Sequence, residues 1–199
     1  MASKMKFRPV IIGIAVVGFF AGLFAAQSLL KQQGLGLLPG QGGDFTLQSS
    51  SGPVSLSDFK GRVVALYMGY MACPDICPTS LWNLSEAVKQ LSDEQARAVQ
   101  GIFVSVDPDR DSPEALDIFA RGFFRDFVGL TGDKGKLDAV ARQYGFLYEK
   151  VPLKDSALGY VIDHSSVIYL IDRQGVLQAF IPHDTAPEII KAELLELIS

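Results

Sequence analysis

The chain has 199 residues, which is enough for one domain and an appendage, and its formal net charge is −4. Residues 1–31 carry four of the 18 basic side chains and none of the 22 acidic ones. The remaining residues therefore carry 14 basic and 22 acidic side chains, a net charge of −8, which argues against nucleic-acid binding. Two cysteines are also too few to form the framework of a disulfide-rich fold.

The first segment of the chain is predicted to be a membrane anchor. Residues 10–30 contain no charged side chain, and 21 residues in a helix would span a hydrocarbon core of about 30 Å. Lys4, Lys6 and Arg8 precede this segment. Only Lys31 follows it closely, and this asymmetry predicts that the N-terminus is cytoplasmic and that the rest of the chain is exported.

A cleaved signal peptide is the alternative to the anchor. Its apolar region would usually be about 7–15 residues long, shorter than the region found here, and the small residues at 26–28 match a cleavage site only weakly. We therefore predict a membrane anchor over residues 1–31, with the transmembrane helix at about 10–30. A flexible, glycine-rich tether follows over 32–43, and the exported domain occupies 44–199.

The exported domain alternates strand-like and helix-like segments. Apolar runs rich in β-branched and aromatic residues predict strands at 45–48, 54–56, 62–70, 101–106, 127–130, 161–163, 166–172 and 176–181. Helices are predicted to begin at Pro78 with Cys77 as N-cap, at Pro113 with Ser112 as N-cap, at Lys136 with Gly145 ending the helix, and at a capping box formed by Thr185 and Glu188. This order predicts a mainly parallel sheet covered by helices on both faces, with antiparallel strands near the C-terminus.

The two cysteines, Cys73 and Cys77, carry the strongest chemical signal in the sequence. They lie between the predicted strand 62–70 and the predicted helix at Pro78, where unpaired backbone N–H groups and the helix dipole favour the thiolate. Thiolate is the form that attacks disulfides and binds metals. Three residues separate the two cysteines, so the loop can direct both sulfurs to one point or let them close into a disulfide.

The histidine His164 makes a metal site one interpretation of this pair. Two thiolates and an imidazole suit copper, as Cu(I) or Cu(II), and also zinc. Structural zinc usually has four protein ligands, and the sequence offers no convincing fourth, whereas an incomplete ligand set suits a metal that is handed on. The plainer interpretation is an ordinary disulfide between Cys73 and Cys77, with His164 as a polar residue at the start of the strand 166–172.

Several neighbouring side chains are weaker candidates for the same site. Met71 could bind copper through its thioether, whereas Met68 is assigned to the core. Asp75 and Asp163 could orient the ligands, although roles at a turn and at a strand end are slightly favoured. The carboxylates of the segment 107–111 are expected to make turn and cap contacts rather than to bind a hard metal ion.

Three segments together resemble the Sco/SenC family of copper-binding, thioredoxin-like proteins. They are YMGYMACPDICPTSL at 67–81, VSVDPDRDSPE at 104–114 and DHSSVIYLID at 163–172, and they occur in the family order. The cysteine and histidine segments are jointly specific, and the resemblance extends from about Asp44 to the C-terminus. Family members often have histidine directly before the first cysteine, where this chain has Ala72, a departure that leaves the three main ligands in place.

The resemblance implies an α/β fold, a thioredoxin-like mixed sheet flanked by helices, preceded by one N-terminal transmembrane helix. It implies copper bound by Cys73, Cys77 and His164, which we expect at one ion per chain. It further implies a metallochaperone that assembles the dinuclear copper centre of cytochrome c oxidase subunit II. The domain would face the bacterial periplasm from the inner membrane, or the mitochondrial intermembrane space if the organism is eukaryotic.

Two other functions fit the same residues. A thiol-disulfide oxidoreductase would use Cys73 and Cys77 as catalytic residues to reduce the cysteines of the target copper site, and it would not need His164. A copper or redox sensor would signal through its metal state. The expected partners are subunit II of the oxidase, the membrane, and another periplasmic copper chaperone or a thiol reductant, with no nucleic acid among them.

Overall fold

The computed structural model describes residues 41–154 and 156–199. The predicted membrane anchor, 1–31, lies outside the described residues, as does most of the predicted tether, 32–43. Among the helices of the described part, none combines the length and the apolar character that a bilayer-spanning helix needs.

Strands and helices alternate through most of the described chain. The strands are β1 (Thr46–Ser49), β2 (Gly52–Ser55), β3 (Val63–Gly69), β4 (Val99–Ser105), β5 (Val128–Leu130), β6 (Tyr148–Pro152), β7 (Tyr160–His164), β8 (Val167–Ile171) and β9 (Leu177–Pro182). The helices are the short 3-10 helix η1 (Leu56–Phe59), α2 (Ile76–Lys89), α3 (Asp93–Arg97), α4 (Pro113–Phe123), α5 (Lys134–Tyr144) and α6 (Pro187–Ile198).

The central sheet has five strands in the order β5-β4-β3-β8-β9. Strands β3, β4 and β5 are parallel, whereas β8 and β9 pair antiparallel to their neighbours. Every residue of β3 and β4 is buried, as expected for apolar strands in the centre of a sheet with both faces covered. The predicted mixed sheet is therefore confirmed.

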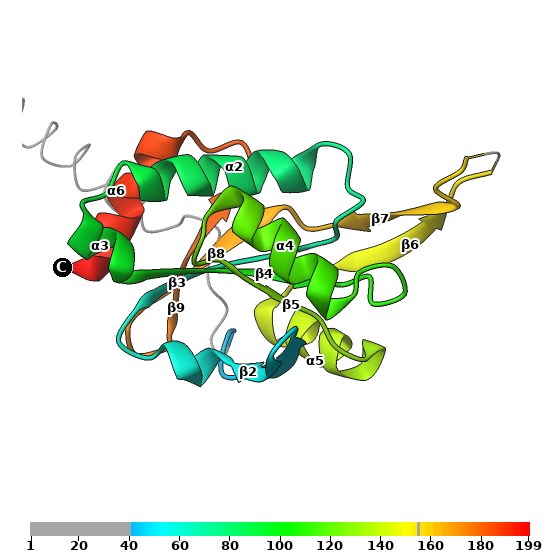
Figure 1. Ribbon diagram of the computed structural model, residues 1–199, viewed down its shortest axis with the longest axis horizontal. Helices are drawn as coiled ribbons and strands as arrows, with labels where there is room; N and C mark the ends of the chain where they lie inside the picture. The colour runs from blue at the N-terminus through cyan, green and yellow to red at the C-terminus, as the bar shows by residue number, and fades with distance from the viewer. Residues whose placement is uncertain (1–40, 155) are drawn as a thin grey trace, which may run out of the picture. The chain divides into compact units, whose positions relative to one another are not determined.

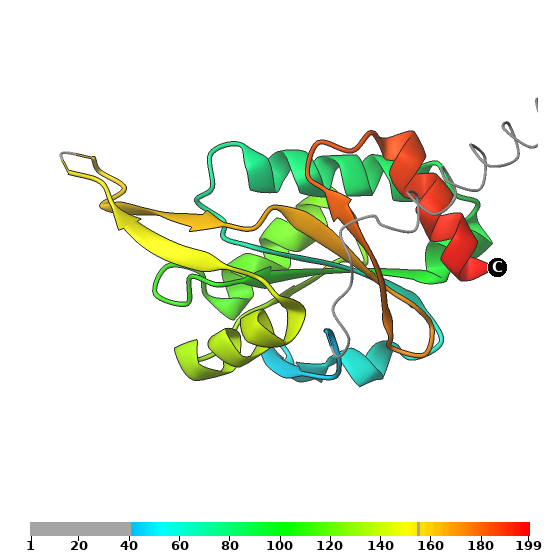
Figure 2. The ribbon, with the colours of Figure 1, turned by 180° about the vertical axis from the view of Figure 1, so that it is seen from behind.

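The helices flank this sheet on opposite sides. In two views from opposite directions, α2 and α6 lie above the strands and α5 lies below them (Figures 1 and 2). Two predicted helix ends are confirmed. The Ser112 hydroxyl accepts a hydrogen bond from the Ala115 N–H at 3.3 Å, and Gly145 ends α5 with a left-handed φ of 66°.

Three predicted helix starts are wrong. Helix α5 begins at Lys134 rather than Lys136, because the Asp133 side chain caps it by accepting from the Lys136 N–H. Helix α2 begins at Ile76 with Asp75 as N-cap, so Cys77 lies inside the first turn rather than at the cap. The first turn tolerates Pro78 beyond its first position, because the N–H groups there have no partner within the helix. Helix α6 begins at Pro187 after Ala186, without the predicted capping box, because a proline holds the preceding residue extended.

The hairpin β6–β7 was not predicted as such. Its strand Tyr148–Pro152 was missed because it is largely exposed and contains charged residues and a proline. The hairpin forms its own two-stranded sheet and projects away from the central sheet (Figures 1 and 2). It is the element that carries His164, which pairs with Tyr148 at its base.

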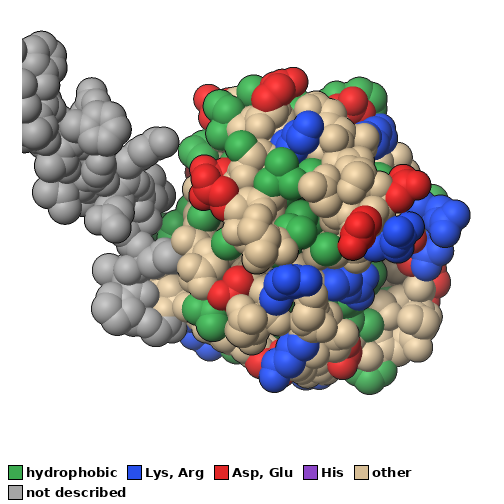
Figure 3. Space-filling model, turned by 90° about the vertical axis from the view of Figure 1, so that its left-hand side faces the viewer, with side chains coloured by type: hydrophobic (Ala, Val, Ile, Leu, Met, Phe, Trp, Pro, Cys, Tyr) green, Lys and Arg blue, Asp and Glu red, His purple; other side chains and the backbone are tan. Residues whose placement is uncertain are grey.

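The face at the end of the domain opposite this hairpin carries both signs of charge. Lysine and arginine side chains are interspersed there with aspartate and glutamate side chains and with apolar ones (Figure 3). No single sign of charge dominates that face.

Candidate metal centre

Cys77 is the fully buried ligand candidate. It is the second residue of α2, and its side chain has 0% of its surface exposed. Its sulfur lies close to the end of β3, at Gly69. A Cβ atom at Gly69 would lie 2.6 Å from Cys77 Sγ, so the glycine leaves the space that this sulfur occupies.

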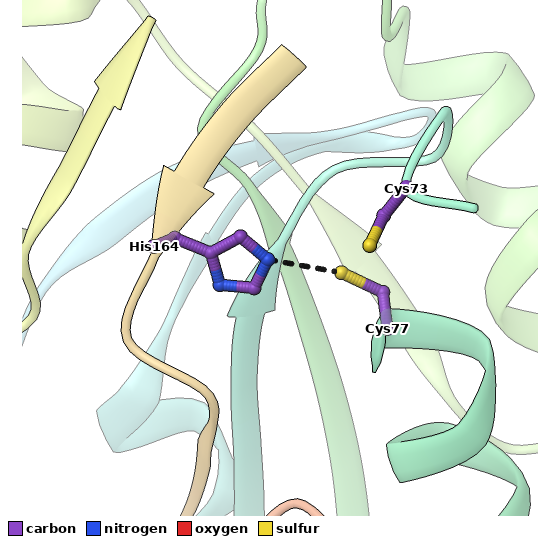
Figure 4. A group of neighbouring side chains, drawn as sticks. All are labelled: Cys73, Cys77 and His164. Atoms are coloured by element: carbon purple, nitrogen blue, oxygen red, sulfur yellow. Dashed lines mark hydrogen bonds between the residues drawn. The ribbon is translucent and has the colours of Figure 1, made fainter. Parts of the chain in front are cut away.

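Cys73 lies in the loop between β3 and α2 and is half-buried. The loop turns tightly, with the Cys73 N–H donating to the Tyr70 carbonyl at 3.3 Å. The Met71 N–H donates to Asp111 Oδ2 at 2.9 Å, which ties the loop to the segment that follows β4. Cys73 and Cys77 are free thiols, and their sulfurs lie near one another (Figure 4).

His164 comes from the last position of β7 and points its ring at the two sulfurs (Figure 4). Its Nδ1–H donates to the Ser165 carbonyl at 2.8 Å, and its Nε2 faces Cys77 Sγ at 3.4 Å. The rings of Tyr70 and Phe146 hold the imidazole, with centroid distances of 5.9 and 5.8 Å. A backbone carbonyl on the far nitrogen is one of the usual partners that orient a histidine ligand.

The ligand atoms of Cys73, Cys77 and His164 all lie within 4.8 Å of one another. Two sulfurs and one imidazole nitrogen form a donor set that suits copper. The predicted sites therefore converge in space, although 87 positions separate Cys77 from His164.

The sequence model of the SCO1/SenC family matches residues 38–199, which is most of the chain. This chain belongs to the SCO1/SenC family. Sco proteins are involved in cytochrome c oxidase assembly and in copper binding.

Individual relatives support the same assignment. An SCO2-like protein of Rickettsia conorii is 35% identical over 158 residues, which cover 79% of this chain and 75% of that protein. The copper-bound structure of Bradyrhizobium japonicum ScoI has a TM-score of 0.70 at 35% identity and covers 79% of this chain and 99% of that one. Copper-bound yeast Sco1 has a TM-score of 0.71 at 28% identity and covers 79% of this chain and 88% of that one.

The thioredoxin-like fold of this Sco chain thus matches structures that contain copper. Copper is the metal found in the homologous structures, and Cys73, Cys77 and His164 of this chain are able to hold a metal ion.

The two thiols of the Sco site differ sharply in acidity. A hydrogen bond from the Cys77 thiol lowers the pKa of Cys73 to about 3, against the opposing effect of partial burial. The same hydrogen bond, together with burial, raises the pKa of Cys77. At neutral pH the metal-free pair therefore holds one proton, on Cys77, and a metal that binds both sulfurs must displace it.

Two opposing effects act on the pKa of the His164 imidazole. Burial acts to lower the pKa of its imidazole, but hydrogen bonds with the Cys73 thiolate and with the Ser165 carbonyl outweigh burial and raise this pKa. A raised imidazole pKa means that the proton and the metal compete for the same nitrogen, so acid should weaken metal binding.

A pocket of about 410 Å³ opens beside the two more accessible ligands, Cys73 and His164. Its other walls include Val151 and Val161 of the β6–β7 hairpin and Pro74 of the cysteine loop. The site is therefore closed on the Cys77 side and approachable on the Cys73 side, through a largely apolar opening.

The weaker candidates differ in where they lie. Met68 is 1% exposed in β3 and belongs to the core, as predicted, while Met71 is partly buried against that core. Asp75 and Asp163 both line the pocket, and Asp75 is also the N-cap residue of α2. The segment 107–111 makes the expected turn contacts, but its Asp107 and Asp111 are buried, which the sequence did not indicate.

Proposed function

We propose that this chain is a copper metallochaperone that binds one copper ion through Cys73, Cys77 and His164. In this role it helps to assemble the dinuclear copper centre of cytochrome c oxidase subunit II. The single observation that carries the proposal is the convergence of three soft or borderline donors within 4.8 Å at a pocket that is open on one side.

The geometry suits a metal that is cargo rather than a permanent structural ion. A structural site usually surrounds its metal with four protein ligands, whereas the described part of the chain brings three together here. The half-buried Cys73 can be reached by an incoming ligand. Cys77 is buried and the His164 ring packs against the Tyr70 ring, so these two ligands keep their positions. Ligand exchange would therefore begin at the Cys73 side of the ion, with a ligand of the acceptor replacing this thiolate.

The proposal also places the domain outside the cytoplasm. The uncharged segment 10–30 would anchor the chain in the inner membrane with the domain in the periplasm, or in the mitochondrial inner membrane facing the intermembrane space. Because such compartments favour disulfides, a thiol reductant or a copper-donating chaperone would be needed to maintain or load the pair.

A copper titration tests the ligand set. The reduced full chain in detergent should bind one copper per chain, and Cu(II) should produce strong thiolate-to-metal absorption bands. The variants Cys73→Ser and His164→Ala should lose affinity and alter these bands. His183→Ala is the matched control, because His164 and His183 are the only two histidines in the chain. Unchanged stoichiometry and spectra in both ligand variants would refute the proposed site.

Copper transfer tests the role. The copper-loaded chain would be mixed with the reduced copper-binding domain of an oxidase subunit II. We expect its charge-transfer bands to decrease as the spectrum of a dinuclear centre appears, with wild type and His183→Ala behaving alike. Retention of all copper by the chain, in the presence of a reduced acceptor that takes up free copper, would count against the chaperone role.

Because Cys73 is a thiolate at neutral pH and can attack a disulfide, reduction of a target disulfide is a second candidate function. The Cys73 thiolate would attack one target sulfur, forming a mixed disulfide and releasing the other target sulfur as a thiol. Cys77 would then attack Cys73, so that a Cys73–Cys77 disulfide forms and the target leaves with two thiols and two more electrons. Cys77→Ser should trap the mixed disulfide, and His164→Ala should not abolish its formation. A trap that never forms would exclude this activity.

A further inference from the structure

The segment 107–111 follows β4 and lies against the end of β3. The Val106 N–H donates to the Gly69 carbonyl at 2.9 Å, which holds the two strand ends side by side. Two aspartates of this segment are buried, with Asp107 0% and Asp111 2% exposed. Burial of a carboxyl group costs free energy unless the group is paired or hydrogen-bonded. The hydrogen-bond partners of these two aspartates therefore show which parts of the chain they connect.

Asp111 holds the cysteine loop. Its Oδ2 accepts hydrogen bonds from the Met71 N–H at 2.9 Å and from the Ser105 hydroxyl at 2.5 Å. Met71 lies two positions before Cys73, so this contact fixes the chain just before the metal-binding thiol.

Asp107 and Arg110 hold the β6–β7 hairpin. The Tyr160 hydroxyl donates to Asp107 Oδ1 at 2.7 Å, while Arg110 Nε donates to the other oxygen of the same carboxylate. Arg110 Nη1 also donates to the Tyr160 carbonyl at 3.2 Å, and its guanidinium lies 3.8 Å from the centroid of the Tyr160 ring. Tyr160 is therefore held through its hydroxyl, its ring and its backbone.

Tyr160 and His164 are the first and last residues of β7. Because alternate residues of a strand face the same way, both share a face with Ile162, which is only 3% exposed. Fixing Tyr160 therefore fixes the position and the rotation of the strand that ends at His164.

Arg110 reaches His164 by a second route. Its guanidinium lies 5.6 Å from the Tyr70 ring centroid, and the Tyr70 ring meets the His164 ring edge-on at 5.9 Å. Tyr70 is only 2% exposed, so it has little freedom to move independently of these two neighbours.

We propose that Asp107 and Arg110 are positioning residues that set His164 against the cysteine loop. The hairpin is a separate two-stranded sheet, and an isolated hairpin of this kind is only marginally stable. The segment 107–111 contacts the hairpin through Tyr160 and the cysteine loop through Met71, so it determines the distance between the two halves of the site. This inference rests on the proposed role of His164 as a copper ligand, but it concerns a geometry that exists without copper.

The test measures the position of the His164 ring in the metal-free, reduced full chain in detergent. Because the chain has only two histidines, a histidine-labelled sample should give two sets of ring signals by NMR, with His183 as an internal reference. In Arg110→Gln we expect the His164 signals to shift and their cross-peaks to the Tyr70 ring to weaken, while the His183 signals stay in place. Arg121→Gln, which removes an exposed arginine that pairs with Asp117 on α4, is the matched control and should leave all signals unchanged.

Copper binding provides the second readout. Residues that orient metal ligands typically contribute 10–100-fold to metal affinity, so Arg110→Gln should weaken copper binding by about that factor and shift the thiolate-to-Cu(II) bands. Arg121→Gln should bind copper as the wild type does. Unchanged His164 signals in a folded Arg110→Gln variant would overturn the inference, as would unchanged copper affinity and spectra in that variant.

A second variant covers the case in which Arg110→Gln does not fold. Tyr160→Phe removes only the hydroxyl that Asp107 accepts and keeps the ring beneath Arg110, so a smaller shift of the His164 signals is expected. An unchanged His164 signal in this variant would then overturn the inference. If the wild type itself bound no copper, the proposed function would fail, whereas the metal-free NMR comparison would still decide the positioning role.

Discussion

His164 Nε2 lies 3.4 Å from Cys77 Sγ, across 87 positions of sequence. The sulfur is held by the first turn of α2 and the ring by the end of the β6–β7 hairpin, so the contact exists only while both elements are in place. The ring already has its Nδ1 directed to the Ser165 carbonyl and its Nε2 directed to the sulfurs. The site is thus preorganised for a metal, and its properties in the metal-free chain can be tested as well as those with copper.

Cys73 should remain reactive in acid. Its pKa of about 3 means that it is a thiolate at pH 5, whereas the pKa of Cys77 is raised and its side chain is buried. We expect the rate of Cys73 alkylation by iodoacetamide to change little between pH 8 and pH 5. An ordinary thiol with a pKa near 8.5 would lose reactivity about tenfold per pH unit over most of that range.

Mass spectrometry of the alkylated peptides checks this prediction, with the urea-unfolded chain as the control for ordinary thiol behaviour. The lowered pKa also means that the ionised Cys73 stabilises the folded chain above the ordinary thiol pKa, and that this contribution is lost as the pH falls towards 3. A steep loss of Cys73 reactivity between pH 8 and pH 5 would show that its pKa is close to normal.

Gly69→Ala should displace Cys77 and so disturb the metal site. The new Cβ would lie 2.6 Å from Cys77 Sγ, so the sulfur or the start of α2 must move. Overpacking of this kind typically lowers the free energy of unfolding by about 1–3 kcal/mol, and we expect copper affinity to fall as well. Chemical denaturation and a copper titration measure the two effects.

Gly122→Ala is the matched control for that substitution. A Cβ at Gly122, within α4, meets no atom within 4 Å, and replacing glycine by alanine inside a helix should stabilise it by about 0.5–1 kcal/mol. Wild-type stability and copper affinity in Gly69→Ala would show that the space beside Cys77 is not as restricted as the structure indicates.

Asp111→Ala should loosen the cysteine loop. The substitution leaves the Met71 N–H and the Ser105 hydroxyl without their acceptor, which should lower the free energy of unfolding by about 1–3 kcal/mol. Hydrogen exchange at the Met71 amide should accelerate more than exchange in the centre of β3. Asp126→Ala, at an aspartate with 65% of its side chain exposed, should stay within about 0.5 kcal/mol of the wild type. Equal stability of the two variants would contradict the anchoring role of Asp111.

Copper should stabilise the folded chain, and its removal should reverse the effect. A ligand that binds only the folded state at 100 times its Kd adds about 2.7 kcal/mol to the free energy of unfolding, so the unfolding temperature should rise with copper. A chelator should return it to the metal-free value. His164→Ala should show a smaller rise than His183→Ala at the same copper concentration. An equal rise in these two variants would indicate that copper binds elsewhere.

The amino-acid sequence by itself determined the central strands, two of the helix ends and the identity of the ligand candidates. The buried runs in β3 and β4, the Ser112 cap and Gly145 are local signals, because propensity and hydrophobic pattern act over a few residues. Cys73, Cys77 and His164 could likewise be chosen by donor chemistry and by family resemblance.

Only the tertiary structure decided how those candidates are arranged. The exposed strand β6 carries no hydrophobic pattern, so the hairpin that positions His164 could not be recognised from the sequence. The carboxyl groups of Asp107 and Asp111 look like ordinary turn residues until folding buries them against Tyr160 and Met71. Contacts between such distant positions depend on the packing of the whole domain, because no local preference encodes which side chains will meet once the chain has folded.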